Sequence, residues 1–237
     1  MKLSAPIFRL KRQAKARARE ARIPLVAALN RIAEEEGFRS WSELAARHEE
    51  RDLAAEILTR LEQGDMVLIG ARPMQGKTAL ALKILAAACK AGRPGFFFTL
   101  EYTKAEAWEK LRSFGLELDS ERVRVDTSDA ICADYMVEKL RGAHPGAVIV
   151  VDYLQALDQR RENPPLSGQI AALSEFARRE RLIFVFISQI DRHYDAAGNA
   201  LPGIADVRLP NKVDLSIFTK TCFLREGEVI LNSAKAA

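Results

Sequence analysis

Residues 70–78 read Gly70-Ala71-Arg72-Pro73-Met74-Gln75-Gly76-Lys77-Thr78. An apolar run typical of a strand, Met66 to Ile69, precedes this stretch, and a nearly all-apolar helical pattern, Lys77 to Lys90, follows it. A glycine-containing turn between a strand and a helix directs backbone N–H groups at a phosphate. The ammonium of Lys77 and the hydroxyl of Thr78 stand where β/γ-phosphate oxygens and Mg²⁺ are bound. We therefore expect a nucleotide-binding loop over Ala71, Arg72, Pro73, Met74, Gln75, Gly76, Lys77 and Thr78, although Ala71 replaces the first glycine of the pattern Gly-x-x-x-x-Gly-Lys-Ser/Thr.

Strand and helix patterns alternate around this loop. Further strands are expected at Gly95 to Leu100, Arg122 to Val125, Ala147 to Val151 and Leu182 to Ile187, and helices at Lys104 to Ser113, Tyr135 to Arg141 and Gly168 to Arg181. The apolar strands lack polar alternation, which is typical of parallel strands covered on both faces. A hairpin is expected at Thr221 to Leu231. The order predicts an α/β fold with a mostly parallel central sheet flanked by helices.

The first 49 residues differ from the rest. Residues 1–22 hold eight basic side chains against Glu20 alone, a local charge of +7, so the remaining residues carry −3 of the total of +4. Helices are expected at Ile7 to Arg22, from Pro24 to Gly37, and from Ser40, where Ser40 and Glu43 have capping-box spacing. This predicts a small basic helical module, 1–49, before a larger domain, 50–237. The basic helix is either a solvated face or a contact for nucleic acid or an acidic partner.

Composition excludes several classes of protein. The chain is 48% hydrophobic and 29% charged over 237 residues, as in ordinary soluble globular proteins. Its three cysteines are scattered, which argues against a disulfide scaffold or a cysteine zinc site. No apolar stretch approaches the roughly 18 residues that span a bilayer. We expect a cytoplasmic protein without a membrane partner.

Three polar residues follow apolar strands, at the edge where open α/β sheets bind ligands. Asp152 can support Mg²⁺, or it can cap the next turn. Glu101 can activate water, or it can cap or pair with the helix that begins near Lys104. Gln189 can sense a γ-phosphate through its amide, or it can be a solvated side chain.

Four separated motifs together resemble the RecA-like P-loop ATPase domain of replicative hexameric helicases of the DnaB type. They are Gly70 to Ala79, Phe97 to Glu101, Val151 to Gln155 and Ser188-Gln189, within residues 50–192. Alanine is common in that family where Ala71 stands. The resemblance implies ATP and Mg²⁺ as cofactors, with Lys77 and Thr78 on phosphate and metal and Asp152 supporting the metal. It also implies that Glu101 activates water and that Gln189 links the γ-phosphate to DNA-contacting loops.

The resemblance further implies single-stranded DNA as a partner and a homo-oligomer, with a hexamer as the family's form. The corresponding loops are Asp158 to Pro165, with Arg160 and Arg161, and Ile190 to Asn211, with Arg192. Arginines in such loops either contact phosphate or are simply solvated.

The chain also departs from the family pattern. The usual Leu-Glu-Met reads Leu100-Glu101-Tyr102, the large N-terminal helical domain is replaced by the basic module, and the C-terminal stretch that supplies an arginine finger is not recognisable. Lys220 and Arg225 are the candidates nearest to its place. Two functions therefore remain open: a helicase-like ATPase acting on single-stranded DNA in replication or DNA maintenance, and a nucleotide-dependent DNA-binding accessory protein that does not unwind. A recombinase-like or signalling ATPase of the same fold is a third option.

Overall fold

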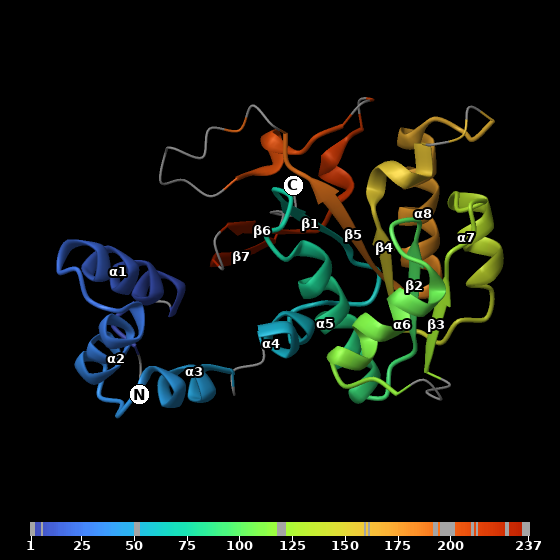
Figure 1. The fold of residues 1–237 in the computed structure, drawn as a ribbon. Helices are drawn as coiled ribbons and strands as arrows, with labels where there is room; N and C mark the ends of the chain where they lie inside the picture. Colours follow the sequence, from blue (N-terminus) through green and yellow to red (C-terminus); the bar gives the residue numbers. More distant parts are fainter. Residues whose placement is uncertain are drawn as a thin grey trace. The chain divides into compact units, whose positions relative to one another are not determined.

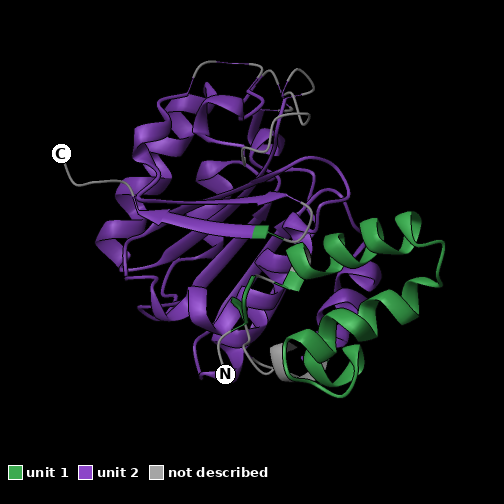
Figure 2. Cartoon of the chain, turned by 90° about the vertical axis from the view of Figure 1, so that its left-hand side faces the viewer, with its two compact units in different colours: residues 1–53, 226–228 green, residues 54–225, 229–237 purple. Residues whose placement is uncertain are grey.

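The computed structural model divides the chain into two compact units. It describes residues 3–5, 7–49, 53–117, 122–158, 160, 162–191, 194, 202–209, 211, 213–225 and 228–233. The first unit comprises residues 1–53 with 226–228, and the second comprises residues 54–225 with 229–237 (Figure 2). Each unit is described by itself below.

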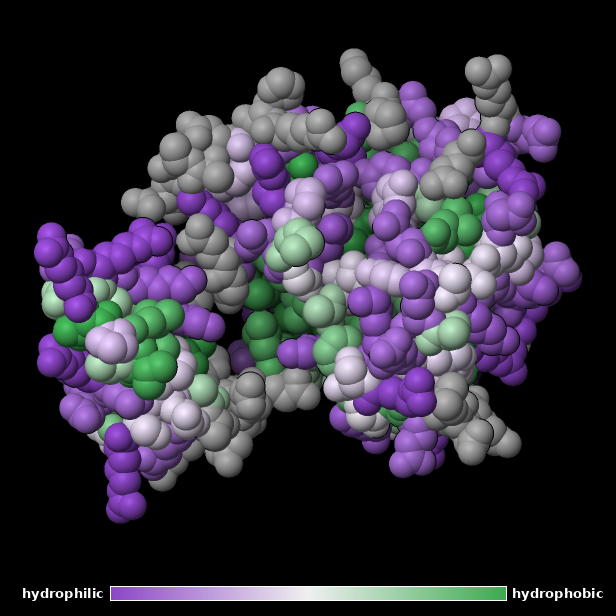
Figure 3. Space-filling view, viewed as in Figure 1, coloured by the Kyte–Doolittle hydropathy of each residue, from purple (hydrophilic) through white to green (hydrophobic). Residues whose placement is uncertain are grey.

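The first unit contains three helices, α1 (Ile7–Glu20), α2 (Leu25–Glu35) and α3 (Trp41–Glu49). Leu10 and Ala14 of α1 pack with Ala28, Ile32 and Ala33 of α2 in a small core. The other side of α1 is exposed and basic, and Figure 3 shows hydrophilic residues along this helix. Burial of one apolar face therefore fixes α1 while its cations remain in solvent.

The expected capping box at α3 forms in an altered version. The Ser40 hydroxyl accepts a hydrogen bond from the Glu43 N–H at 3.2 Å, as the spacing predicts. The Glu43 carboxylate accepts a hydrogen bond from the N–H of Arg39, one residue before Ser40, at 2.9 Å. Both bonds still satisfy N–H groups at the beginning of the helix.

The second unit is built on a seven-stranded sheet (Figure 1). Its strands are β1 (Met66–Ala71), β2 (Gly95–Thr99), β3 (Val123–Asp126), β4 (Val148–Asp152), β5 (Ile183–Gln189), β6 (Lys220–Arg225) and β7 (Glu228–Ser233), in the order β3-β2-β4-β5-β1-β6-β7. The pairs β3-β2, β2-β4, β4-β5, β5-β1 and β1-β6 are all parallel. Because the strands are parallel, their carboxyl ends share one edge, and the predicted site residues follow that edge.

Helices cover both faces of the sheet. The helices α4 (Leu53–Thr59), α5 (Lys77–Lys90) and α6 (Lys104–Ser113) pack with strand residues such as Val67 and Phe97. The helices α7 (Ala133–Lys139) and α8 (Leu166–Glu180) pack on the opposite face with Phe96 and Phe184. Strands β1, β2, β4 and β5 are buried on both faces, which explains their unbroken apolar runs in the sequence. The predicted fold class is therefore confirmed.

Short 3₁₀ helices lie in the connections after β4 and between β5 and β6. They span Leu154–Asp158, Ile204–Asp206 and Leu215–Ile217. Strands β6 and β7 are neighbours joined by residues 226–227, which agrees with the expected hairpin. Among the helices that the structure describes, none has the length and apolar character needed to cross a membrane.

Lys220 is part of the interior of the second unit. Its ammonium lies 2.7 Å from the carboxylate of Asp65, and the two side chains are 10% and 8% exposed. Asp65 also accepts hydrogen bonds from the Thr219 hydroxyl at 2.6 Å and from the Glu62 N–H at 2.7 Å. Lys220 begins β6, so it lies at the amino edge of the sheet, opposite to the predicted nucleotide site. Its candidacy as a finger for a neighbouring subunit is therefore wrong.

Replacement Lys220→Met is expected to lower the free energy of unfolding by roughly 3 kcal/mol, because it leaves the buried Asp65 carboxylate without its counter-charge. The two remaining hydrogen bonds to Asp65 place the effect at the low end of the usual range. Urea unfolding measures it, with Lys104→Met at an exposed position as the control. A loss no greater than that of the control would contradict the structural role of this ion pair.

Candidate functional site

The phosphate loop runs from the end of β1 to the beginning of α5. Gly76 precedes α5 with φ +85° and ψ 15°, the left-handed conformation that glycine adopts without strain. No heavy atom would lie within 4 Å of a Cβ at this position, so the backbone conformation alone requires glycine. Leu80 donates its N–H to the Gly76 carbonyl at 2.9 Å, which closes the first turn of the helix. The first N–H groups of α5 are thereby left to face a ligand.

The alanine at the first position of the loop pattern has a local explanation. Ala71 is the last residue of β1, where it is buried and pairs with Gln189 of β5 and Leu224 of β6. A residue in a regular strand needs no left-handed conformation, and a small side chain is sufficient there. The position that excludes a side chain is Gly70, because a Cβ would lie 2.7 Å from the ring of Phe223.

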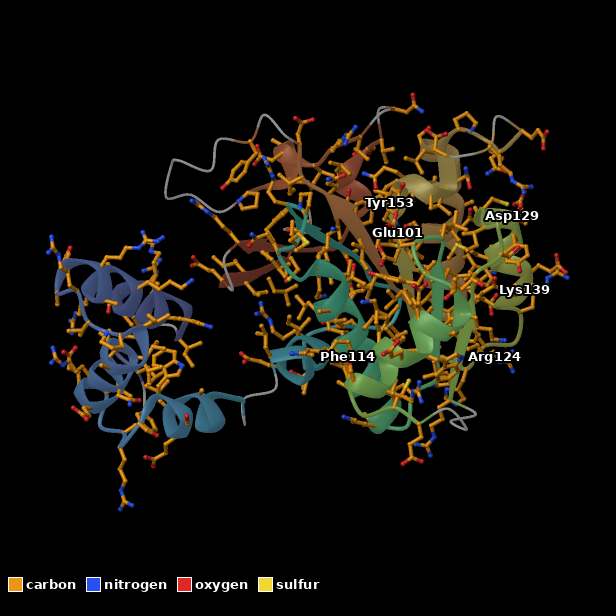
Figure 4. The ribbon with its side chains drawn as sticks, viewed as in Figure 1. Glu101, Phe114, Arg124, Asp129, Lys139 and Tyr153 are labelled. Carbon is orange, nitrogen blue, oxygen red and sulfur yellow. The ribbon has the colours of Figure 1, made fainter. Side chains whose placement is uncertain are left out.

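Six of the predicted residues line one cavity of about 300 Å³ at the carboxyl edge of the sheet. They are Pro73, Lys77, Thr78, Glu101, Asp152 and Gln189, and Tyr102 and Tyr153 complete the lining. Figure 4 labels two of the lining residues, Glu101 and Tyr153, which follow β2 and β4 respectively. Residues distant in the sequence are thus brought together by parallel strand pairing, in which Thr99 stands beside Asp152.

Asp152 ends β4 and is 3% exposed. Burial raises the pKa of its carboxyl group to about 6, with the Thr78 hydroxyl acting in the lowering direction and the Glu101 carboxylate in the raising direction. Its Oδ2 is buried and has no hydrogen-bond partner among the described residues. A carboxylate oxygen held away from water beside a threonine hydroxyl is a donor set that suits Mg²⁺. Oδ2 therefore caps no turn among the described residues.

The affinity for Mg²⁺ in the presence of nucleotide is expected to depend on pH through Asp152. The raised pKa means that a proton competes with the metal below about pH 6, so the apparent affinity should fall by about tenfold per pH unit there and be level above pH 7. Because the pKa of Asp152 is raised in the folded protein, its protonated carboxyl group stabilises the metal-free fold at low pH. That contribution to stability is lost as the pH rises through 6. Titrations of Mg²⁺ between pH 5 and 7.5 measure the effect, with protein-free nucleotide titrated in parallel. Asp152→Asn should abolish the protein's pH dependence, and a wild-type profile equal to that of Asp152→Asn would contradict the assignment.

Glu101 is exposed and lies two residues beyond the end of β2. It is not the cap of α6, because Thr103 holds that position and forms a capping box with Glu106. Its backbone N–H donates to the Thr99 hydroxyl at 3.1 Å, which holds the turn that carries it. Gln189 ends β5 half-buried and lines the cavity rather than lying fully in solvent. The capping alternative for Glu101 is thus excluded, and Gln189 lies where an amide can meet a ligand.

The other predicted residues are distributed differently. Met74 is 99% exposed at the tip of the loop, with φ +65°. The Arg72 guanidinium donates to the Asp191 carbonyl at 3.4 Å, and Gln75 is half-buried. Arg160 is exposed and forms an ion pair with Asp129 at 2.6 Å. The predicted DNA contacts Arg161 and Arg192 lie outside the described residues.

Sequence reasoning assigned no role to Gln155, which the structure places between two loops. Its amide nitrogen donates to the Ser188 hydroxyl at 3.1 Å and to the Arg208 carbonyl at 2.5 Å. It therefore ties the turn after Asp152 to the end of β5 and to the segment beyond it. Its place three residues after Asp152 was the one hint of a role in the sequence. No residue near Gln155 in the sequence identifies Ser188 or Arg208 as its partner.

The comparisons with known proteins point to one family. Residues 51–141 match the model of the DnaB-like helicase C terminal domain. A relative named replicative DNA helicase DnaB from Leifsonia xyli subsp. xyli is 25% identical over 195 residues, which is 67% of this chain. The resemblance to DnaB-type helicases is therefore confirmed. Relatives of the same name from Synechocystis sp. and Helicobacter pylori are 25% and 24% identical, each over 62% of this chain.

These DnaB relatives are longer proteins. The matches cover 42% of the Leifsonia protein, 21% of the Synechocystis protein and 37% of the Helicobacter protein. Two solved structures share the fold. One is an ATPase domain, which aligns with a TM-score of 0.56 and 21% identity, covering 68% of this chain and 69% of that one. The other is a DnaB-like replicative helicase, described with its interactions with primase, which aligns with a TM-score of 0.57 and 18% identity, covering 91% and 64%. At these identities the likeness establishes the RecA-like fold of the DnaB type and no more.

Proposed function

We propose that this protein binds Mg²⁺–ATP in the cavity at the carboxyl edge of the sheet and hydrolyses it. The observation that carries the proposal is the convergence of Lys77, Thr78, Glu101, Asp152 and Gln189 on one cavity of about 300 Å³. The chemistry of these groups is complementary: a cation and helix N–H groups for phosphate, a buried carboxylate for metal, and an exposed carboxylate for water.

Each residue has a defined task in the proposed reaction. Lys77 and the first turn of α5 bind the β- and γ-phosphates, and Glu101 orients the attacking water and accepts its proton. Thr78 and Asp152 hold Mg²⁺, which neutralises the phosphate charge when it is bound. Gln189 donates its amide to the γ-phosphate, and its position at the end of β5 connects it to the segment from Ile190 onward.

The substrate that we propose for the coupled work is single-stranded DNA, in replication or DNA maintenance in the cytoplasm. The family of the second unit supports this choice, as does the excess of cations in residues 1–22. A homo-oligomer, possibly a hexamer, is the assembly that the same relationship favours. Sedimentation with and without ATP and single-stranded DNA tests it, and a monomer under all conditions would contradict a ring.

The second candidate is an accessory protein that binds DNA under the control of nucleotide without unwinding it. The observation that favours it is the burial of Lys220 against Asp65, which removes one of the two candidates for an arginine finger. A strand-displacement assay on a tailed duplex distinguishes the two functions, because only the helicase-like function predicts unwinding. ATP hydrolysis stimulated by DNA without displacement would favour the accessory role.

The exposed cations Lys11, Lys15 and Arg19 follow one another at four-residue spacing, so they share a face of α1. Replacement of all three by Gln is expected to reduce the slope of log affinity for oligothymidylate against log salt by about 2, since each contact to a single strand contributes about 0.7. Fluorescence anisotropy over a salt series measures this. We prefer it to deletion of residues 1–22, which would remove Leu10 and Ala14 from the core of the first unit.

The matched control replaces Arg60, Lys90 and Arg112 of the second unit by Gln, an equal loss of charge at exposed positions. Equal reductions in slope for both triple variants would show that overall charge, rather than the face on α1, anchors the DNA.

A further inference from the structure

A second cavity, of about 370 Å³, lies at the opposite end of the sheet from β6 and β7. It is bordered by strand β3, the beginning of α6 and the end of α7, and it shares no lining residue with the nucleotide cavity. Phe96, Phe98 and Trp108 contribute apolar surface to it, and Lys104, Arg124 and Lys139 contribute charge. The proposed ATPase reaction makes no use of this cavity.

Strand β3 is an edge strand. It ends the sheet order, and within the described residues β2 is the one strand that pairs with it. Gly95 of β2 donates its N–H to the carbonyl of Arg122 at 2.6 Å. In a parallel ladder the residues of a strand bond alternately to either side, so Arg124 also faces β2, whereas Val123 and Val125 direct their N–H and C=O groups away from the sheet. These backbone groups can pair with a further strand.

Three cations flank that free edge. The Arg124 guanidinium lies 5.8 Å from the centre of the Phe96 ring, and the Lys139 ammonium lies 5.1 Å from that of Tyr135, on the α7 side of the sheet. Lys104 lies on α6, which covers the other face. None of the three forms an ion pair with a carboxylate in the part of the chain that the structure describes. Figure 4 labels Arg124 and Lys139.

Among the described residues, Asp126 is the one acidic member of the lining, and its carboxylate already accepts two hydrogen bonds. Asp126 accepts the Ser128 N–H at 2.9 Å on one carboxylate oxygen and the Tyr135 hydroxyl at 2.9 Å on the other. Its single charge offsets at most one of the three cations Lys104, Arg124 and Lys139, so the described lining keeps an excess of positive charge. Lys104 adds to this excess, because a cation in the first turn of a helix adds to the positive end of the helix dipole.

We propose that strand β3 binds an extended acidic segment of a partner protein, which adds to the sheet as an eighth strand. The outward backbone groups of Val123 and Val125 give the pairing, and Lys104, Arg124 and Lys139 select acidic side chains on both faces of the added strand. A nucleic acid fits less well. Phe96 is 8% exposed beneath Arg124 and Phe98 is 2% exposed, so neither ring offers a face on which a base can stack, and the half-buried Trp108 is the one aromatic ring of the described lining that remains for stacking.

The same charges disfavour a second copy of β3. Antiparallel or parallel pairing of two such edges would bring Arg124 and its neighbouring cations close to their own equivalents, and like charges across strands are destabilising. The cations thus protect the edge from self-association while leaving it open to an acidic partner.

The test uses the full chain and a fluorescent peptide of sequence Glu-Glu-Val-Val-Glu-Glu-Val-Val, whose paired acids place carboxylates on both faces of a strand. Fluorescence anisotropy should show saturable binding that weakens with salt. The matching Lys-Lys-Val-Val peptide should not bind. The Glu-Glu-Pro-Pro peptide has the same charge but lacks half of the N–H groups, and its affinity should be at least about tenfold lower.

Each of the single variants Lys104→Glu, Arg124→Glu and Lys139→Glu should weaken binding of the acidic peptide by about fivefold. The triple variant, which combines the three changes, should abolish binding. Arg112→Glu, at an exposed position of α6 outside the cavity, should change it by less than twofold. Val125→Pro removes one outward N–H, so it should also weaken binding of the acidic peptide. This check of strand pairing requires that the thermal unfolding of the variant match that of the wild type.

Four results would overturn the proposal. No saturable binding up to millimolar peptide would remove the site, and equal binding of the proline peptide would show charge attraction without strand addition. Binding of octathymidylate that is lost in the triple variant but not in Arg112→Glu would assign the edge to nucleic acid. Concentration-dependent self-association that the triple variant abolishes would assign it to a second copy.

Discussion

Replacement of Glu101 by Gln is expected to lower the rate of ATP hydrolysis by about 10²–10⁴-fold, because the amide cannot accept the proton of the attacking water. Binding of ATP should change little, since Glu101 is exposed at the mouth of the cavity and the phosphate-binding groups are elsewhere. Steady-state hydrolysis measures the first effect, and equilibrium binding of a fluorescent ATP analogue measures the second.

The matched control for this variant is Glu109→Gln, an exposed glutamate on α6 outside the cavity. Hydrolysis that survives in Glu101→Gln at the level of this control would show that another group activates the water. Loss of ATP binding together with hydrolysis would instead place Glu101 on the metal.

Lys77→Ala is expected to weaken ATP binding and to reduce hydrolysis by about 10²–10³-fold or more, because among the described residues its ammonium is the one side-chain cation in the cavity lining that can neutralise the β/γ-phosphate charge. Lys83→Ala, at an exposed position six residues further along α5, should leave both unchanged. Isothermal titration with Mg²⁺–ATP and an assay of released phosphate report on the two quantities. Equal affinities in the two variants would show that nucleotide does not bind at this loop.

Much of the fold was predictable because the central strands are buried on both faces. Val148 to Val151 and Ile183 to Ile187 are continuous apolar runs, and such runs have few alternatives to a parallel sheet when helical patterns separate them. The convergence of Glu101, Asp152 and Gln189 followed from the same rule, since parallel strands end at one edge. Their chemical roles stay predictions, which the variants above test.

The boundaries of the strands depended on long-range pairing. Strands β1 and β5 were expected to end at Ile69 and Ile187, but each extends two residues further, because Gly70 pairs with Ser188 and Ala71 with Gln189. A glycine and a serine beside a loop carry no local signal for a strand. Non-local hydrogen bonds between two carboxyl ends decide these residues, and no sequence window contains both partners.

Lys220 shows the same limit for a side chain. A lysine near the C-terminus is most often exposed, and the sequence offered no sign that Asp65 lies beside it. The pair forms only because β6 inserts next to β1, more than 150 residues away in the chain. Lys220 was a candidate arginine finger because of its place in the sequence. The sheet topology instead makes it the internal counter-ion of Asp65.

Because Phe223 of β6 packs against Gly70 of β1, the pairing of β6 with β1 can affect nucleotide affinity. The strand that leads into the phosphate loop is clamped laterally, with β5 on one side and β6 on the other, and the Phe223 ring fills the space that a side chain at Gly70 would take. Any change in the size of that ring shifts the point from which the loop departs. Variants with altered ATP affinity can thus arise near the end of the chain, at a residue that never touches the nucleotide, and a selection for such variants should sample β6 as densely as the loop itself.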